Sequence, residues 1–219
     1  MKKLNRILTL LTLLLCLLAH QTLAQTAQTV TKRQFALPQV ATPPTIDGDI
    51  SDTVWKSAFY VENFLRYGNS STPINAKDKT EAWICSDNTN LYVAFYCHDG
   101  QPEKIRASET QRDSFGVFQD DHVGIQIDSQ NTRRGFSNFS VNARGTQIAQ
   151  IEGGTATNLT WVGDWKAKTH RVADGWTCEV AIPFKMLRYP KGGAAIGLDV
   201  TRKIARETNN TMWPTAFRE

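Results

Sequence analysis

The sequence contains few cysteines, and their number and spacing are not those of a disulfide-rich or zinc-binding protein. Four cysteines occur in 219 residues, and Cys16 lies in an apolar segment near the N-terminus. The other three, Cys85, Cys97 and Cys178, are an odd number and form no C-x-x-C motif. Neither a disulfide framework nor a zinc site is indicated, so we expect three buried free thiols.

An excess of charge of one sign is also lacking. The formal net charge of +4 reflects 25 Lys and Arg against 21 Asp and Glu. Three of the basic residues, Lys2, Lys3 and Arg6, lie in residues 1–24, which contain no acid, so the remainder is nearly neutral. A chain this balanced has no general electrostatic attraction for nucleic acid. Nucleic acid is therefore excluded as the default partner.

Motifs of the common enzyme classes are missing as well. The sequence has no G-x-S-x-G, no H-E-x-x-H, no P-loop and no glycine-rich dinucleotide loop. A glycosidase needs two carboxyl groups about 5–9.5 Å apart, whereas Asp120 and Asp128 are separated by roughly 26 Å of extended strand. A cross-strand pair of Asp121 with Glu152 stays open. We expect no catalytic residue in this domain.

The first 24 residues have the pattern of a secretory signal peptide. A short basic region precedes an apolar run from Ile7 to Ala19, and Thr22 and Ala24 put small residues at the positions that a signal peptidase reads. About 13 apolar residues are fewer than the roughly 20 that a membrane-spanning helix needs. We expect residues 1–24 to be a cleaved signal peptide and 25–34 a flexible leader. The protein would then be exported, to the periplasm, the outer membrane or the medium.

Helical periodicity is sparse, and short strands dominate from Phe35 onward. Strands are predicted at 81–86, 91–98, 122–128, 136–142, 147–152, 165–172, 176–182 and 196–204. Single helical turns are predicted only near Val54 and after Pro183. Many short strands between Asn-, Asp- and Gly-containing turns predict an all-β fold, an antiparallel β-sandwich of jelly-roll or immunoglobulin-like type. One domain, residues 35–219, accounts for the pattern.

The turn at Asp87–Asn90 predicts a register. If these four residues join two paired strands, Ser86 faces Leu91 and Cys85 faces Tyr92. Because strand side chains alternate, Cys97 then lies on the opposite face from Cys85, and the two cannot form a disulfide.

Oxygen-rich segments and aromatic residues supply the binding candidates. Asp47, Asp49, Asp121 and Asp128 are candidate ligands for a structural calcium ion, with solvated turns as the alternative. Six Trp and ten Phe are many for one core. Flat exposed rings grip the apolar faces of sugars, and Phe118 and Trp213 both lie in sequence typical of loops.

Several segments together resemble the family 9 carbohydrate-binding modules, over about residues 35–219. The segments that carry the resemblance are Ile46–Trp55, Leu91–Phe95, Gln119–Asp128 and Gly175–Pro183. Within the family, Asp121–Gly124, Arg133–Phe136 and Phe139–Gly145 are most similar to the amino-terminal module of large Bacteroidetes-type secreted or outer-membrane proteins.

This resemblance implies a β-sandwich that binds poly- or oligosaccharide without cleaving it, beside glycoside hydrolase domains that break O-glycosyl bonds. It further implies that two rings clamp a terminal sugar, supported by polar side chains and calcium. Phe118 and Trp213 match the ring positions, and Asn142 and Asn210 match sugar-contacting polar positions. Gly124 and Ser140 stand where the family has an acidic contact and an arginine.

The leading prediction is an exported carbohydrate-binding module that serves carbohydrate catabolism. The alternative is a non-catalytic interaction or assembly domain of an outer-membrane protein, without a working sugar site. Its partner would be a barrel region or hydrolase domain that is missing from this chain. We expect the chain to be a fragment of a longer protein. A third hypothesis, a haem module, requires Met186 or Met212 to converge with His98 or His170.

Overall fold

The structure is a computed structural model and describes residues 35–66, 76–132, 134–152, 164–187, 195–208 and 210–213. The chain divides into two compact units, Met1–Ala36 and Leu37–Glu219. Every helix and strand that the structure describes belongs to the second unit. The predicted signal peptide, residues 1–24, and the predicted leader, residues 25–34, lie outside the described residues.

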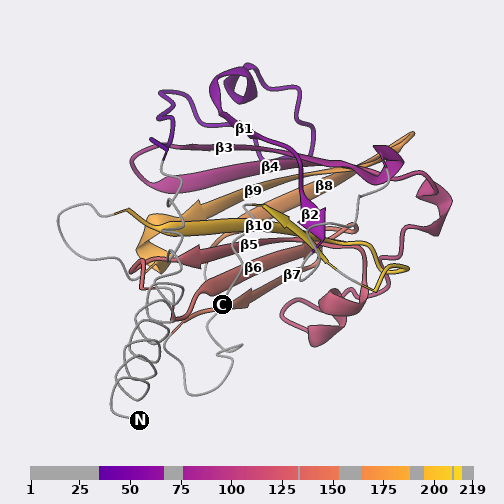
Figure 1. Cartoon of the computed structure of the whole chain (residues 1–219). Coiled ribbons are helices and arrows are strands. Elements are labelled where there is room, and N and C mark those ends of the chain that lie inside the picture. Colours follow the sequence, from indigo (N-terminus) through magenta and orange to yellow (C-terminus); the bar gives the residue numbers. More distant parts are fainter. Residues whose placement is uncertain are drawn as a thin grey trace, which may run out of the picture. The chain divides into compact units, whose positions relative to one another are not determined.

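Two antiparallel sheets form a sandwich (Figure 1). Sheet A has the order β1 (Phe59–Val61), β3 (Thr80–Ser86), β4 (Asn90–His98), β9 (Gly175–Pro183) and β8 (Lys166–Val172). Sheet B has the order β2 (Leu65–Arg66), β11 (Thr211–Trp213), β10 (Gly197–Lys203), β5 (His122–Asp128), β6 (Ser137–Asn142) and β7 (Gln147–Gln150). The predicted all-β antiparallel sandwich is confirmed.

The helical elements among the described residues are single 3-10 turns. They are η1 (Thr53–Ser57), η2 (Ala76–Asp78), η3 (Pro102–Lys104), η4 (Phe115–Gln119) and η5 (Phe184–Met186). η1 and η5 confirm the two predicted turns, whereas η4 falls in a segment predicted to be a loop. Within the described part of the chain, no helix has the length and apolar character needed to cross a lipid bilayer.

Alternate residues of each strand fill the space between the sheets. Val123, Ile125 and Ile127 of β5 are at most 1% exposed, as their alternation predicted. Facing them are large side chains of sheet A, including Phe95 and Trp176. Burial of each such side chain contributes about 1.5–3 kcal/mol, so this inner layer is the main source of stability.

Cys85 and Cys97 lie where the turn predicted them. Cys85 pairs with Tyr92 and Ser86 with Leu91 across β3 and β4. Cys85 packs in a cluster on the outer face of sheet A, while Cys97 lies in the core between the sheets. Cys178 is also buried, and all three are free thiols. Burial raises the pKa of Cys97 to about 12, which keeps its thiol neutral.

A buried arginine ties the two sheets together at one end. Arg202 of β10 is 1% exposed, and its Nη1 donates to the carbonyl oxygens of Asp78 and Lys79 at 3.1 Å each, just before β3. Its Nη2 lies 3.7 Å from Oδ2 of buried Asp99. Asp99 also accepts hydrogen bonds from Arg206 at 2.8 and 2.9 Å. The charge of Arg202 is therefore compensated where it is buried.

A buried glutamate fixes the segment that covers part of sheet A. Residues 40–58 pack Val54 and Trp55 over the outer face of the sheet. Glu179 of β9 accepts hydrogen bonds from Trp55 Nε1 at 2.9 Å, Gly48 N at 2.9 Å and Asp47 N at 3.0 Å. Burial raises the pKa of this carboxyl group against the effect of those donors. Gly48 has a φ of +94°, and a Cβ there would lie 2.7 Å from the Thr169 carbonyl carbon.

Replacing the buried carboxylate tests this attachment. Glu179→Gln puts an amide NH2 among three N–H donors, and we expect the free energy of unfolding to fall by about 2–4 kcal/mol in urea denaturation. Lys168, exposed and directly opposite Glu179 on β8, provides the control. Lys168→Ala should change stability by less than about 0.5 kcal/mol. Equal effects of the two substitutions would contradict the role given to Glu179.

Candidate functional site

Two phenylalanine rings lie together on η4, beside the outer face of sheet B. Phe115 is 51% exposed, and Phe118 is half-buried. Their ring centroids are 6.1 Å apart at an interplanar angle of 46°. Phe118 also meets the ring of His122 edge-on, with centroids 5.6 Å apart. The predicted ring residue Phe118 is therefore at the surface, and Phe115, which was not predicted, is its partner.

Asn142 holds the loop that carries these rings. Its Nδ2 donates to Glu109 O and to Asp120 Oδ2, both at 2.9 Å. Its Oδ1 accepts from Arg144 N at 3.1 Å and from Thr146 N at 2.8 Å. The side chain is fully buried and has used its two donors and two acceptor positions. In this structure Asn142 positions the ring-bearing loop and presents no group to a ligand.

Asp120 and His122 continue the same buried network. Burial alone would raise the pKa of Asp120, but hydrogen bonds from Ser108 N, Glu109 N and Asn142 outweigh it and place the pKa below its ordinary value. His122 Nδ1 lies 3.0 Å from Asp120 O, an acceptor, so Nδ1 carries the proton. Burial lowers the pKa of His122 to about 4. The imidazole under Phe118 is therefore neutral at physiological pH.

Small polar side chains surround Gly124 on the outer face of sheet B. Gly124 pairs with Ser140 on one side and with Thr201 on the other, so the three share a face. A Cβ at position 124 would lie 2.5 Å from Thr201 Oγ1 and 3.2 Å from Ser140 Oγ. The threonine hydroxyl fills the space that an acidic side chain at position 124 would need. Asn138 donates to Ser140 Oγ and to Gln150 Oε1 at 3.2 Å each. Asn138 and Ser140 are buried, whereas Thr201 and Gln150 are partly exposed on this face.

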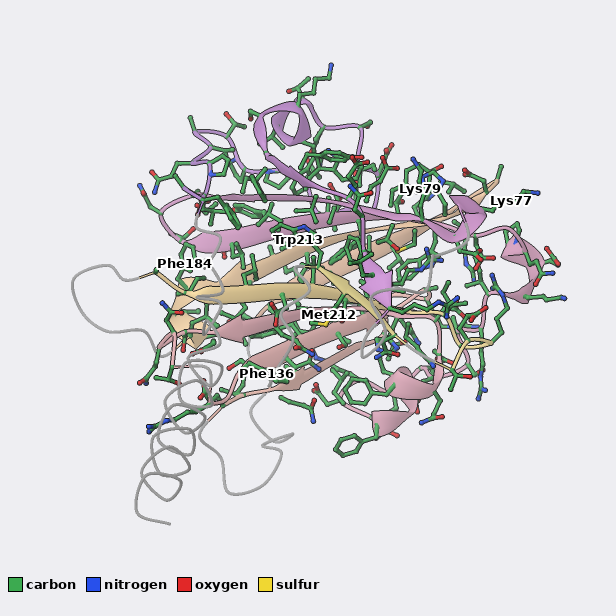
Figure 2. The ribbon with its side chains drawn as sticks, viewed as in Figure 1. Lys77, Lys79, Phe136, Phe184, Met212 and Trp213 are labelled. Atoms are coloured by element: carbon green, nitrogen blue, oxygen red, sulfur yellow. The ribbon has the colours of Figure 1, made fainter. Side chains whose placement is uncertain are left out.

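Trp213 does not lie in a loop, and its ring faces the core. It belongs to β11, pairs with Val200 of β10 and packs against Phe59 with centroids 5.8 Å apart. Met212, paired with Thr201, takes the outer side, and Figure 2 shows the two residues on opposite sides of the strand. A strand of three residues is too short for its alternation to be recognised. Trp213 and Phe118 therefore lie on opposite faces of sheet B.

The remaining predicted sugar contact is Asn210. It is exposed and immediately precedes β11. Of the four residues that the resemblance implied, the structure brings Phe118 and Asn142 together around His122. The side chain of Trp213 packs against the core instead.

The four aspartates predicted for calcium lie apart. Asp47 Oδ1 accepts from Asp49 N at 2.8 Å, and Asp49 Oδ1 accepts from Ser51 N at 3.1 Å, which are turn-forming hydrogen bonds. Asp121 is buried and accepts from Arg106 N at 2.9 Å, whereas Asp128 ends β5 about 23 Å away along the strand. Among the described residues, no three His, Cys, Asp or Glu side chains form a metal-binding group. The four aspartates do not fit a single calcium site.

Two other arrangements left open by the sequence are not formed. Asp121 precedes β5, next to Ala143, while Glu152 N bonds Ser137 Oγ at the other end of β6, so these carboxyl groups lie at opposite ends of sheet B. For the haem hypothesis, Met186 is in the core and Met212 is on the outer face of sheet B. His98 and His170 belong to β4 and β8 of sheet A, so Met212 does not meet either histidine.

The neutral histidine predicts a pH dependence of stability. His122 has a folded-state pKa of about 4, below the roughly 6.5 of a free histidine. The unfolded chain therefore takes up this proton first, and stability falls as the pH drops from about 6.5 to about 4, by up to about 3 kcal/mol. In urea denaturation across this range, His122→Gln should remove that part of the slope. Exposed His170 gives the control variant, His170→Gln, and identical slopes for the two variants would refute the buried neutral imidazole.

Known proteins resemble this chain in sequence and in fold. The family described as "Carbohydrate family 9 binding domain-like" matches residues 46–213. A family 9 carbohydrate-binding module from Caldicellulosiruptor kristjanssonii, in complex with cellotriose, has a TM-score of 0.56 at 18% identity, over 81% of this chain and 83% of that chain. The glucose complex of a family 9 module from the same organism has a TM-score of 0.57 at 18% identity, with 80% and 83% covered.

A protein from Bacteroides uniformis has the same fold, with a TM-score of 0.59 at 10% identity, over 81% of this chain and 87% of that chain. Among curated proteins, none matches this sequence. The sandwich, the order of its motifs and the match over residues 46–213 agree. The chain belongs to the family 9 carbohydrate-binding domain-like proteins.

Proposed function

We propose that this chain is an exported module that binds poly- or oligosaccharide against Phe118 and Phe115 and so supports carbohydrate breakdown. One observation carries the proposal: two rings, one of them 51% exposed, are held beside a sheet face on which the hydroxyl group of Thr201 and the amide group of Gln150 are partly exposed. Rings supply the apolar platform for a sugar face, and hydroxyls and amides meet its hydroxyl groups. The solved relatives in complex with cellotriose and glucose support this ligand class.

The rings are positioned before any ligand arrives. Glu109 accepts from Asn142 through its backbone oxygen at 2.9 Å and from Ser114 Oγ through its carboxylate at 2.6 Å. Thr146 Oγ1 adds a third hydrogen bond, to Glu109 O at 2.7 Å. A loop held by so many bonds loses little conformational freedom on binding, which favours affinity.

The second ring of the proposed site is Phe115 and not Trp213. Trp213 packs against Phe59 on the core side of sheet B, so the two rings of the predicted clamp cannot face each other. Phe115 and Phe118 both lie on η4, at an interplanar angle of 46°. The proposed site is thus an open platform formed by two neighbouring rings. An open platform suits the side of a saccharide chain better than a clamped terminal unit.

Export rests on the sequence of residues 1–24, with their basic start, their short apolar run and the small residues Thr22 and Ala24 at the end. This pattern is that of a cleaved secretory signal. Outside the cell membrane the domain would meet polysaccharide directly. A role in polysaccharide breakdown requires the domain to be located there. The periplasm, the outer membrane and the medium are all consistent with such a signal.

Removing the central ring tests the proposed function. Phe118→Ala should weaken binding of cellotriose or xylotriose at least about tenfold in calorimetric titration, equivalent to about 1.4 kcal/mol of lost stacking. Phe35 is also an exposed ring, at 37%, and Phe35→Ala is the matched control. We expect the control to bind as the wild type does.

Trp213→Ala separates the open platform from the predicted clamp. Because Trp213 packs against the core, its removal should lower the free energy of unfolding by about 2–4 kcal/mol and leave the affinity of the folded protein unchanged. A folded Trp213→Ala protein that no longer binds, together with an unaffected Phe118→Ala protein, would overturn the platform.

A further inference from the structure

The outer face of sheet A carries a second group of aromatic rings, which the proposed function does not use. The segment 40–58 covers part of this face. Tyr60 of β1 remains 43% exposed, one of only three exposed large hydrophobic residues among those described. Trp83 of β3 lies directly beside Tyr60, with ring centroids 5.5 Å apart. On β4, Tyr96 stacks on His98 with centroids 4.0 Å apart at 20°.

Two carboxylates lock the tyrosine rings in place. Tyr60 Oη donates to Glu81 Oε1, and Tyr96 Oη donates to Asp174 Oδ1, both at 2.6 Å. His98 joins the two halves, with Nε2 2.8 Å from Glu81 Oε2 and Nδ1 2.9 Å from Asp174 Oδ2. The hydrogen bond to Asp174, with burial, raises the pKa of Tyr96 to about 12, so this phenol stays a neutral donor. We call Tyr60, Trp83, Glu81, Tyr96, His98 and Asp174 the tyrosine patch.

Charges of both signs lie at and beside the tyrosine patch: Glu81, Asp174 and Glu62, whose Oε2 is 3.2 Å from Tyr60 Oη, are acidic, and Lys77 and Lys79 are basic. Lys79 Nζ lies 3.3 Å from Glu81 Oε2. Figure 2 shows Lys77, which belongs to η2, near Lys79, which immediately precedes β3. The patch and its flanking lysines therefore offer rings, carboxylate acceptors and ammonium donors, and this mixture of charges suits a neutral polar ligand. A cationic ligand would be repelled by Lys77 and Lys79, and an anionic ligand would be repelled by Glu81 and Asp174.

A small depression lies beside the rings. It has a volume of about 280 Å³ and is lined by Lys77, His98, Asp99, Gly100 and Asp174. Pockets for drug-sized ligands usually measure roughly 300–1,000 Å³, so this one takes a smaller group. His98 and Asp174 belong both to the depression and to the tyrosine patch. Ring platform and depression thus form one continuous surface.

We propose that the tyrosine patch is a second contact surface for a neutral saccharide chain, on the sheet opposite to Phe118. It rests on the proposed function, because the ligand class is the same. One sugar unit enters the depression, where Asp174 and Lys77 reach its hydroxyls, and the next units lie along Tyr96 and Tyr60. The two surfaces belong to opposite sheets, so a module with both can contact two chains of a polysaccharide at once.

Calorimetric titration with cellotriose, using paired variants, tests this surface. In a Phe118→Ala background, we expect one class of binding to remain. Adding Tyr60→Ala should weaken that remaining binding at least about fivefold. Adding Tyr60→Phe, which keeps the ring and loses only the hydroxyl, should leave it within about twofold. Phe35→Ala in the same background is the control, and unchanged amide NMR spectra away from β1 show that each variant is folded.

The outcomes separate the two proposals. If Phe118→Ala alone abolishes all binding, or if Phe118→Ala weakens binding while Tyr60→Ala leaves every isotherm unchanged, the second surface is refuted and the proposed function stands. If Phe118→Ala binds as the wild type does and Tyr60→Ala abolishes binding, the second surface is supported and the Phe118 site is refuted. No heat from wild-type protein with cellotriose or xylotriose refutes both.

Discussion

The alternation of side chains along paired strands is the constraint on which the rest of this structure depends. It sends Val123, Ile125 and Ile127 to the core and places His122 and Gly124 on the outer face of sheet B. The same rule, applied to the register of β11 on β10, turns Trp213 inward and Met212 outward. Which residues can meet a ligand is thus decided by strand register before any question of residue chemistry arises.

Buried polar groups then fix the surface segments to this frame. Glu179 fastens residues 40–58 to sheet A through three hydrogen bonds, and Asn142 with Asp120 fastens the loop that carries η4 to sheet B. Each group is buried and would be costly to leave unpaired. The module therefore presents its rings on loops that are held in place by hydrogen bonds. Such loops lose little conformational entropy when a ligand binds.

The sequence predicted the fold well because the strongest patterns are long. The strand His122–Asp128 was predicted at its observed bounds, and the turn after Ser86 gave the correct pairing of Cys85 with Tyr92. The short strands β1, β2 and β11 were missed because two or three residues show no alternation. The resemblance to the family predicted that Phe118 and Trp213 form one site. A resemblance in sequence does not reveal which way a side chain points, so it could not show that Trp213 faces Phe59. Nor could it show that every polar group of Asn142 is already paired. Phe115 was missed because an exposed ring in a short 3-10 turn has no periodic pattern.

The central claim is that the outer face of sheet B, at Phe118, binds saccharide. Titration of isotope-labelled protein with cellotriose, followed by amide and aromatic NMR resonances, tests it most directly. The account predicts saturable shifts of the Phe115 and Phe118 ring resonances and of the amides of Gly124 and Thr201, with the Trp213 indole resonance unmoved. Shifts centred on Trp213, or a spectrum unchanged at every resonance, would contradict it.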